Sequence, residues 1–85
     1  MHMISTGKQI RAARAMLGLR REDLATAAGL HSNAVKYWEA RDVPPGQRPY
    51  AIDRIERALA MLGVIAFADP DPGVRLSVVN NFDSP

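Results

Sequence analysis

Cysteine and long apolar runs are both missing from this 85-residue sequence. Without cysteine the chain can form neither a disulfide bond nor a thiolate metal site, which suits a reducing cytosol. No apolar run approaches the roughly 18 residues that a membrane-spanning helix needs. The first residues also lack the basic stretch and following apolar stretch of a signal peptide. We therefore expect a cytoplasmic protein with no membrane partner.

Recognisable catalytic arrangements are missing as well. The two histidines have no cysteine or paired carboxylate beside them, and no serine has a histidine relay. Asp69 and Asp71 alternate with prolines, as turn residues do. No glycine-rich phosphate loop is present. These absences predict that the protein is not an enzyme and uses no metal, cofactor or small-molecule ligand.

The net charge is small, but the charged side chains are unevenly distributed along the chain. The net charge is only +2, yet residues 1–48 carry eight basic and four acidic side chains, and residues 49–85 carry three basic and five acidic ones. A basic half favours a polyanionic partner for that half of the chain. An ordinary mixed surface would look the same from charge alone, so the charge needs support from a motif.

Four stretches have helical periodicity, at about 6–17, 20–28, 32–40 and 50–62. A glycine follows the first, second and fourth, as is common where a helix ends in a left-handed residue. A proline-rich loop at 40–49 separates the third from the fourth. The side chains expected to face the core are Ile10, Ala13, Leu17, Leu24, Ala27, Ala28, Val35, Trp38, Ile52, Ile55, Leu59 and Leu62.

The end of the chain changes period and predicts a β-hairpin. Strands at 64–68 and 74–79 would flank the turn sequence DPDPG. Val74, Leu76 and Val78 alternate with polar residues, so this face is expected to be buried. A lone hairpin is barely stable in water and must pack on the helices or on another chain.

The stretch from Arg20 to Glu39 reads as two short helices joined by a tight turn, a helix-turn-helix. Such a motif places its second helix, here 32–40, in the DNA major groove. Asparagine can pair with an adenine edge, lysine with guanine or phosphate, and tyrosine offers a hydroxyl and an apolar ring. Arg20 and Arg21 open the first helix of this motif, at about 20–28, and can bind phosphates. Arg41 or Lys8 can do the same. The predicted DNA contacts are Arg20, Arg21, Ser32, Asn33, Lys36, Tyr37 and Arg41.

These residues resemble the phage-repressor and Cro-like helix-turn-helix family, often called the XRE family. The resemblance covers roughly residues 10–63 and rests on RAARAMLGL, on EDLATAAGL, and on the V-x-x-W-E ending of the third helix. It implies a mainly α, four-helix repressor-like domain that binds operators as a homodimer and regulates transcription in bacteria or phages. It also implies that Arg14 and Glu39 form a structural pair tying the first helix to the end of the third.

The chain departs from the family pattern at four places, one of which is the loop at 40–49, longer than usual. The second helix opens with Arg20-Arg21 instead of the usual Ser-Gln, so a serine cap is lost and a cation replaces a phosphate-bracing glutamine. His31 stands where a small hydroxyl cap is frequent, leaving His31 or Ser32 as the expected cap. A hairpin replaces the usual last helix, which puts the usual dimer interface in doubt.

A second family resemblance also predicts DNA binding. GLHSNAVKYWEARDVPP is similar to the segment of the MerR family that runs from the recognition helix into the wing. MerR-type domains begin with the helix-turn-helix, however, and carry no full helix such as 6–17 ahead of it. We therefore prefer the repressor-like interpretation.

The sequence predicts one DNA-binding domain at 6–79, including the hairpin at 64–79, between a disordered segment at 1–5 and a frayed tail at 80–85. The predicted function is sequence-specific binding of double-stranded DNA by a transcriptional regulator of bacterial or phage type, which would be associated with the nucleoid in the cytoplasm. The alternative from another class is a protein-interaction module, antitoxin-like or an adaptor, that docks a partner through the hairpin.

Overall fold

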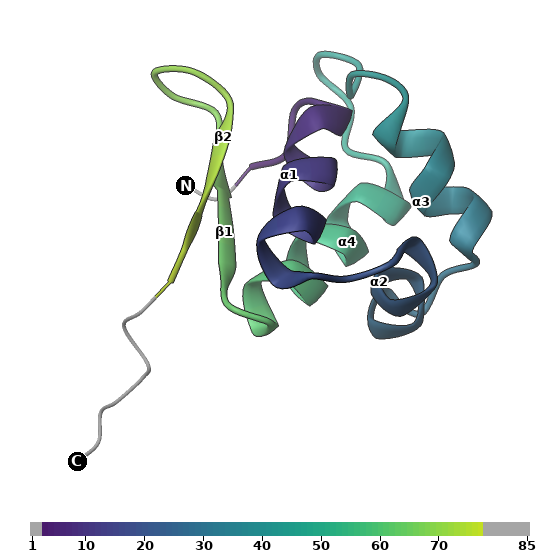
Figure 1. The fold of residues 1–85 in the computed structure, drawn as a ribbon. Helices are drawn as coiled ribbons and strands as arrows, with labels where there is room; N and C mark the ends of the chain where they lie inside the picture. Colours follow the sequence, from purple (N-terminus) through teal and green to yellow (C-terminus); the bar gives the residue numbers. More distant parts are fainter. Residues whose placement is uncertain (1–2, 78–85) are drawn as a thin grey trace.

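The computed structural model describes residues 3–77, so the predicted tail at 80–85, residues 1–2 and Val78 lie outside the described residues. Four helices come first and pack around one core, and an antiparallel two-stranded hairpin follows at one side (Figure 1). This confirms the expected mainly helical domain with a short hairpin. The elements are α1 (Gly7–Leu17), α2 (Arg21–Ala28), α3 (Ser32–Glu39), α4 (Tyr50–Met61), β1 (Val64–Phe67) and β2 (Gly73–Leu76).

Local sequence sets the ends of the first two helices. The Thr6 hydroxyl accepts the N–H of Gln9, and the Gln9 side chain accepts the N–H of Thr6 at 3.0 Å, which together form a capping box for α1. Gly18 and Gly29 end α1 and α2 with φ angles of 68° and 71°. Glycine adopts this left-handed conformation at little cost, so the two helix ends follow directly from glycine placement.

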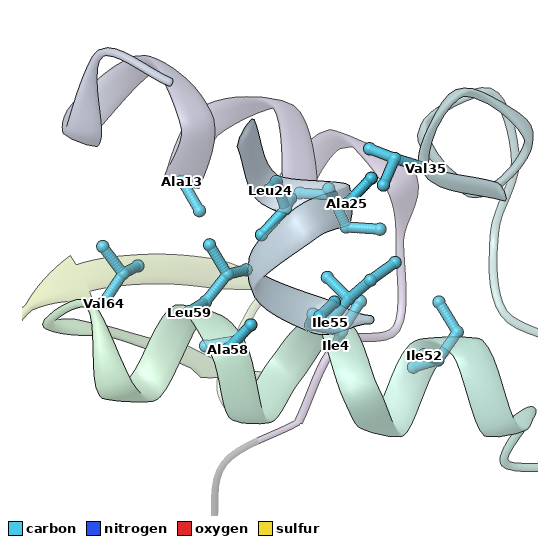
Figure 2. Close-up of a cluster of buried hydrophobic side chains, with 13 residues drawn as sticks. Ile4, Ala13, Leu24, Ala25, Val35, Ile52, Ile55, Ala58, Leu59 and Val64 are labelled. Atoms are coloured by element: carbon cyan, nitrogen blue, oxygen red, sulfur yellow. The ribbon is translucent and has the colours of Figure 1, made fainter. Parts of the chain in front are cut away.

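One hydrophobic core lies between the four helices and β1. Its side chains come from every helix, from β1 and from the segment that precedes α1, and they converge between α1, α2 and α4 (Figure 2). No helix within residues 3–77 has the length and apolar character needed to cross a membrane. The core residues are Ile4, Ile10, Ala13, Leu24, Ala25, Ala28, Val35, Ile52, Ile55, Ala58, Leu59, Val64 and Ala66.

The expectation of disorder at 1–5 is wrong for residues 3–5. Ile4 is only 1% exposed and belongs to the core. The Met3 N–H donates to the carbonyl of Ala66 at 2.9 Å, so this segment runs beside β1 on the side away from β2. The Ser5 carbonyl accepts the N–H of Val43 at 2.9 Å. Because these partners lie about 40 and 60 residues away along the chain, no local pattern could reveal the order of this segment.

Four helical core expectations need correction, and one of them is Leu17, which is only partly buried against the core. Ala27 is exposed and Ala25 is buried, so the inward face of α2 consists of Leu24, Ala25 and Ala28. Leu62 is exposed because α4 ends one residue earlier. Trp38 is only partly buried and packs at the edge of the core, while Val35 is the fully buried residue of α3.

β1 ends one residue earlier than predicted, β2 begins one residue earlier and leaves out Ser77, and residues 78–79 of the predicted strand lie outside the described residues. The two strands are buried unequally. Val64 and Ala66 of β1 are buried against α4, whereas Val74 of β2 is only partly buried and Leu76 is 51% exposed. The expected burial of the Val74 and Leu76 face is therefore wrong at Leu76. The reason is position: β1 takes the place beside α4, and β2 is the outer strand.

Candidate nucleic-acid interface

The outer face of α3 lies at the opposite end of the helical core from the hairpin (Figure 1). Val35 and Glu39 point inward and are buried, which leaves Asn33, Lys36 and Tyr37 exposed and Ser32 partly exposed. His31 caps the helix, because its Nδ1 accepts the N–H of Asn33 at 3.0 Å. The open alternative for the cap is thus resolved in favour of His31.

α1 supports the far end of α3 at very short range. The N–H of Gly7 donates to the carbonyl of Arg41 at 2.9 Å. A Cβ at position 7 would collide with the carbonyl oxygens of Trp38 and Glu39, so only glycine lets the two backbones approach this closely. This contact fixes where α3 ends relative to the rest of the domain.

A buried carboxylate joins α3 to the two preceding helices. The side chain of Glu39 is 2% exposed. It accepts from Arg14 at 2.5 Å (Nε to Oε2) and 3.2 Å (Nη2 to Oε1), and from Arg21 Nε at 2.9 Å. The Arg14–Glu39 pair that the family resemblance implied is present. The Arg21–Glu39 pair was not foreseen, because its members are 18 positions apart in the sequence and no local pattern indicates it.

The start of α2 is capped without the missing serine. The Asp23 carboxylate accepts the backbone N–H of Arg20 at 3.0 Å, as the acidic member of a capping box does. The same carboxylate binds the Arg20 guanidinium at 3.1–3.2 Å. Arg20 therefore shares its charge with Asp23, and less of it is available to an outside anion than the sequence suggested.

Two carboxyl groups in this region have shifted pKa values. Burial raises the pKa of Glu39, but the hydrogen bonds from Arg14 and Arg21 outweigh it and hold the pKa below its ordinary range. Hydrogen bonds from the Arg20 side chain and backbone lower the pKa of Asp23, and the same pair raises the pKa of Arg20. These groups therefore keep their charges over the whole physiological pH range.

A concave pocket of about 380 Å³ opens between the first turns of α2 and α3. Four of its residues are cationic and one is acidic, and Ser32 and Asn33 bring the electropositive start of α3 to its wall. We call it the basic pocket. It is lined by Arg14, Arg20, Arg21, Glu22, Ser32, Asn33 and Lys36.

A second, shallower pocket of about 300 Å³ lies further along α3 and is lined by Asn33, Lys36, Tyr37, Ala40 and Arg41. The Arg41 guanidinium stacks 3.5 Å above the Tyr37 ring, and its Nε donates to the Tyr37 carbonyl at 2.8 Å. The Tyr37 ring in turn meets Trp38 edge-on, with 5.0 Å between ring centroids. Arg41 therefore stacks on the Tyr37 ring, and Trp38 packs against the same ring.

The structure brings all seven predicted contact residues to one end of the molecule. Arg20, Arg21 and Ser32 line the basic pocket, Tyr37 and Arg41 line the second pocket, and Asn33 and Lys36 line both. Three features of this surface were missed from the sequence: the acidic wall at Glu22, the exposed Ala40, and the tie between Arg21 and Glu39.

Comparisons with known proteins leave this surface to be interpreted from its own chemistry. No protein-family model matches the chain, and no curated protein is significantly similar to it.

Proposed function

We propose that this chain binds double-stranded DNA sequence-specifically, with α2 and α3 as a repressor-like helix-turn-helix and α3 in the major groove. Its role would be that of a transcriptional regulator of bacterial or phage type. One observation carries the proposal: the exposed polar face of α3 lies between two pockets, and the pocket at its start is lined by four cations.

The dimensions and chemistry of α3 suit a major groove. With its side chains an α-helix is about 10–12 Å across, so α3 can lie in a major groove about 12 Å wide. Asn33 and Lys36 offer base-edge contacts, while Tyr37 and Ala40 offer apolar surface to a thymine methyl group. Arg21 and Arg20 supply cations beside the start of α3 that can bind backbone phosphates.

The preceding helix favours the repressor-like interpretation over the MerR-like one. α1 runs from Gly7 to Leu17 ahead of α2, and its Arg14 side chain reaches the end of α3. A homodimer on a two-fold symmetric site belongs to the same proposal, since one short helix reads only a few base pairs.

The direct test measures binding of charge-matched variants to a duplex selected from random oligonucleotides. Lys36→Ala and Asn33→Ala should each weaken binding by about 1–3 kcal/mol, which is roughly 5- to 150-fold. Arg75→Ala is the matched control for Lys36→Ala, because Arg75 is an exposed cation on the hairpin at the other end of the molecule. Its effect should stay within about twofold at moderate salt, where charges beyond a Debye length are screened.

Two results would contradict DNA binding through α3. The first is equal loss of affinity in Lys36→Ala and Arg75→Ala, which would indicate a general charge effect. The second is binding that does not weaken steeply as salt rises, because phosphate contacts release counterions. Thermal unfolding of each variant checks that the fold is unchanged.

A protein-interaction module is the second candidate function, and the hairpin end favours it. Leu76 is 51% exposed and Met61 is 87% exposed, and the outer edge of β2 has no strand beside it among residues 3–77. Open strand edges and exposed apolar side chains are typical of surfaces that bind another chain. Failure of the wild-type chain to bind any duplex at low salt would favour this candidate over the first.

A further inference from the structure

Arg21 is held at one end of its guanidinium and open at the other. Its Nε donates to Oε1 of Glu39 at 2.9 Å, and among the described residues neither Nη group has a hydrogen-bond partner. The side chain is 45% exposed and lines the basic pocket. A guanidinium fixed through Nε keeps a planar pair of amino groups for one external acceptor with two oxygens.

The group that holds Arg21 is itself immobilised. Glu39 is buried, and Arg14 binds both of its oxygens. Each of the three guanidinium nitrogens of Arg14 has a partner, since its Nη1 also donates to the Leu19 carbonyl at 2.9 Å. The two arginines therefore differ in their hydrogen bonds. Arg14 holds the Glu39 carboxylate in place, whereas Arg21 is held by that carboxylate and its Nη groups have no partner among the described residues.

The surroundings of the open amino groups favour an anion. Lys36 and Arg20 line the same pocket, and the start of α3 adds the positive end of a helix dipole at Ser32 and Asn33. A DNA backbone phosphate offers two oxygens and a full negative charge, which match a guanidinium fork.

We propose that Glu39 is a positioning residue for DNA binding: it aims Arg21 at one backbone phosphate in the basic pocket. This inference rests on the proposed DNA binding and adds that an acidic, buried side chain strengthens the grip on a polyanion. Coulomb's law alone predicts the opposite, because removing a negative charge near the pocket should strengthen binding to DNA.

The opposite signs of these two expectations define the experiment. Glu39→Gln and Glu22→Gln both remove one negative charge beside the basic pocket, but only Glu39 holds Arg21. Binding to a selected duplex is measured across a salt series for both variants, for Arg21→Ala, and for the double variant of Arg21 and Glu39. Glu22→Gln should bind more tightly than the wild type, whereas Glu39→Gln should bind about tenfold more weakly.

The salt dependence reports the lost phosphate contact itself. The slope of log K against log salt is negative, and Arg21→Ala should make it less steep by about 0.9, the value for one phosphate on duplex DNA. Glu39→Gln should make it less steep by a similar amount, and the double variant should show no further loss. A merely structural role for Glu39 would leave the slope unchanged and the two losses additive.

Arg21→Lys tests the same proposal if Glu39→Gln unfolds the domain. It keeps the charge at a half-exposed position, but one ammonium group cannot reproduce a fork that binds Glu39 and a phosphate together. We expect it to lose most of the affinity that Arg21→Ala loses. Wild-type affinity in Arg21→Lys, or tighter binding by a folded Glu39→Gln, would overturn this inference while DNA binding by the wild type stands. No binding by the wild type at low salt would overturn both proposals.

Discussion

The two ends of this molecule are fastened by buried polar side chains of different kinds. At the α3 end, Glu39 is charged and binds two arginines that belong to α1 and α2. At the hairpin end, Gln9 is neutral: its Oε1 accepts from the N–H groups of Ser5 and Thr6 at 2.7 and 3.0 Å. Its Nε2 donates to the carbonyls of Met3, Phe67 and Gly73 at 2.7–3.2 Å.

This difference sets what each end presents to a partner. The buried carboxylate of Glu39 is bound by Arg14 and Arg21, and these two cations line a pocket that is open to an anion. The amide anchor satisfies backbone groups without any charge, and the surface near it carries exposed apolar side chains such as Leu76. The α3 end therefore suits a polyanion, and the hairpin end suits an apolar protein contact. The predictions below test how separate the two ends are.

Leu24→Ala should destabilise the α3 end and the hairpin end to the same extent. Leu24 is fully buried in the shared core, and such a truncation costs about 2–5 kcal/mol of the free energy of unfolding. Urea denaturation followed by Trp38 fluorescence and by hairpin hydrogen exchange should give the same loss at both ends. Leu62→Ala, at an exposed leucine, is the control and should cost less than about 1 kcal/mol. A loss confined to one probe would show that the ends unfold independently.

Gln9→Ala should loosen the hairpin end more than the α3 end. It leaves N–H groups and carbonyls without partners, at a cost of about 1–3 kcal/mol. Hydrogen exchange of β1 and β2 amides should speed up more than that of α3. Gln47→Ala removes the same side chain from an exposed loop position and should change neither. Equal acceleration in α3 and the hairpin would mean that Gln9 supports the whole domain.

Glu39→Gln should remove part of the acid sensitivity of the fold. The folded-state pKa of Glu39 lies below its ordinary value of about 4.5, so the ionised carboxylate stabilises the fold above that pH. This stabilisation is lost as the pH falls through the folded-state pKa. The stability difference between wild type and Glu39→Gln should therefore be largest near pH 7 and shrink below about pH 4.5 in chemical denaturation. A difference that stays constant down to pH 3 would contradict the assignment.

Leu76→Ser should have the smallest effect on the domain itself. Leu76 is half-exposed on the outer strand, so its replacement should change the free energy of unfolding by less than about 0.5 kcal/mol. Binding of a half-site duplex through α3 should be unchanged, while self-association or partner binding at the hairpin would weaken. Sedimentation and duplex titration separate these effects. A drop in half-site affinity would mean that the hairpin touches DNA.

Local sequence was sufficient wherever a structure depends on neighbours within one or two turns. The ends of α1 and α2 follow from Thr6, Gly18 and Gly29, and the stripe of α4 follows from the spacing of Ile52, Ile55 and Leu59. The outward face of α3 was also predictable, since helical spacing that buries Val35 exposes Lys36 and Tyr37.

Only the tertiary structure decided which distant groups meet. Ile4 is ordered because β1 and α4 lie beside it, Leu76 is exposed because β2 is the outer strand, and Arg21 is aimed because Glu39 is held by Arg14. Sequence periodicity states which face of an element is apolar, but it carries no information on which element covers that face. The sequence thus determined the helices and the chemistry of the α3 surface. Packing between segments far apart in the chain turned one of its arginines into an oriented group.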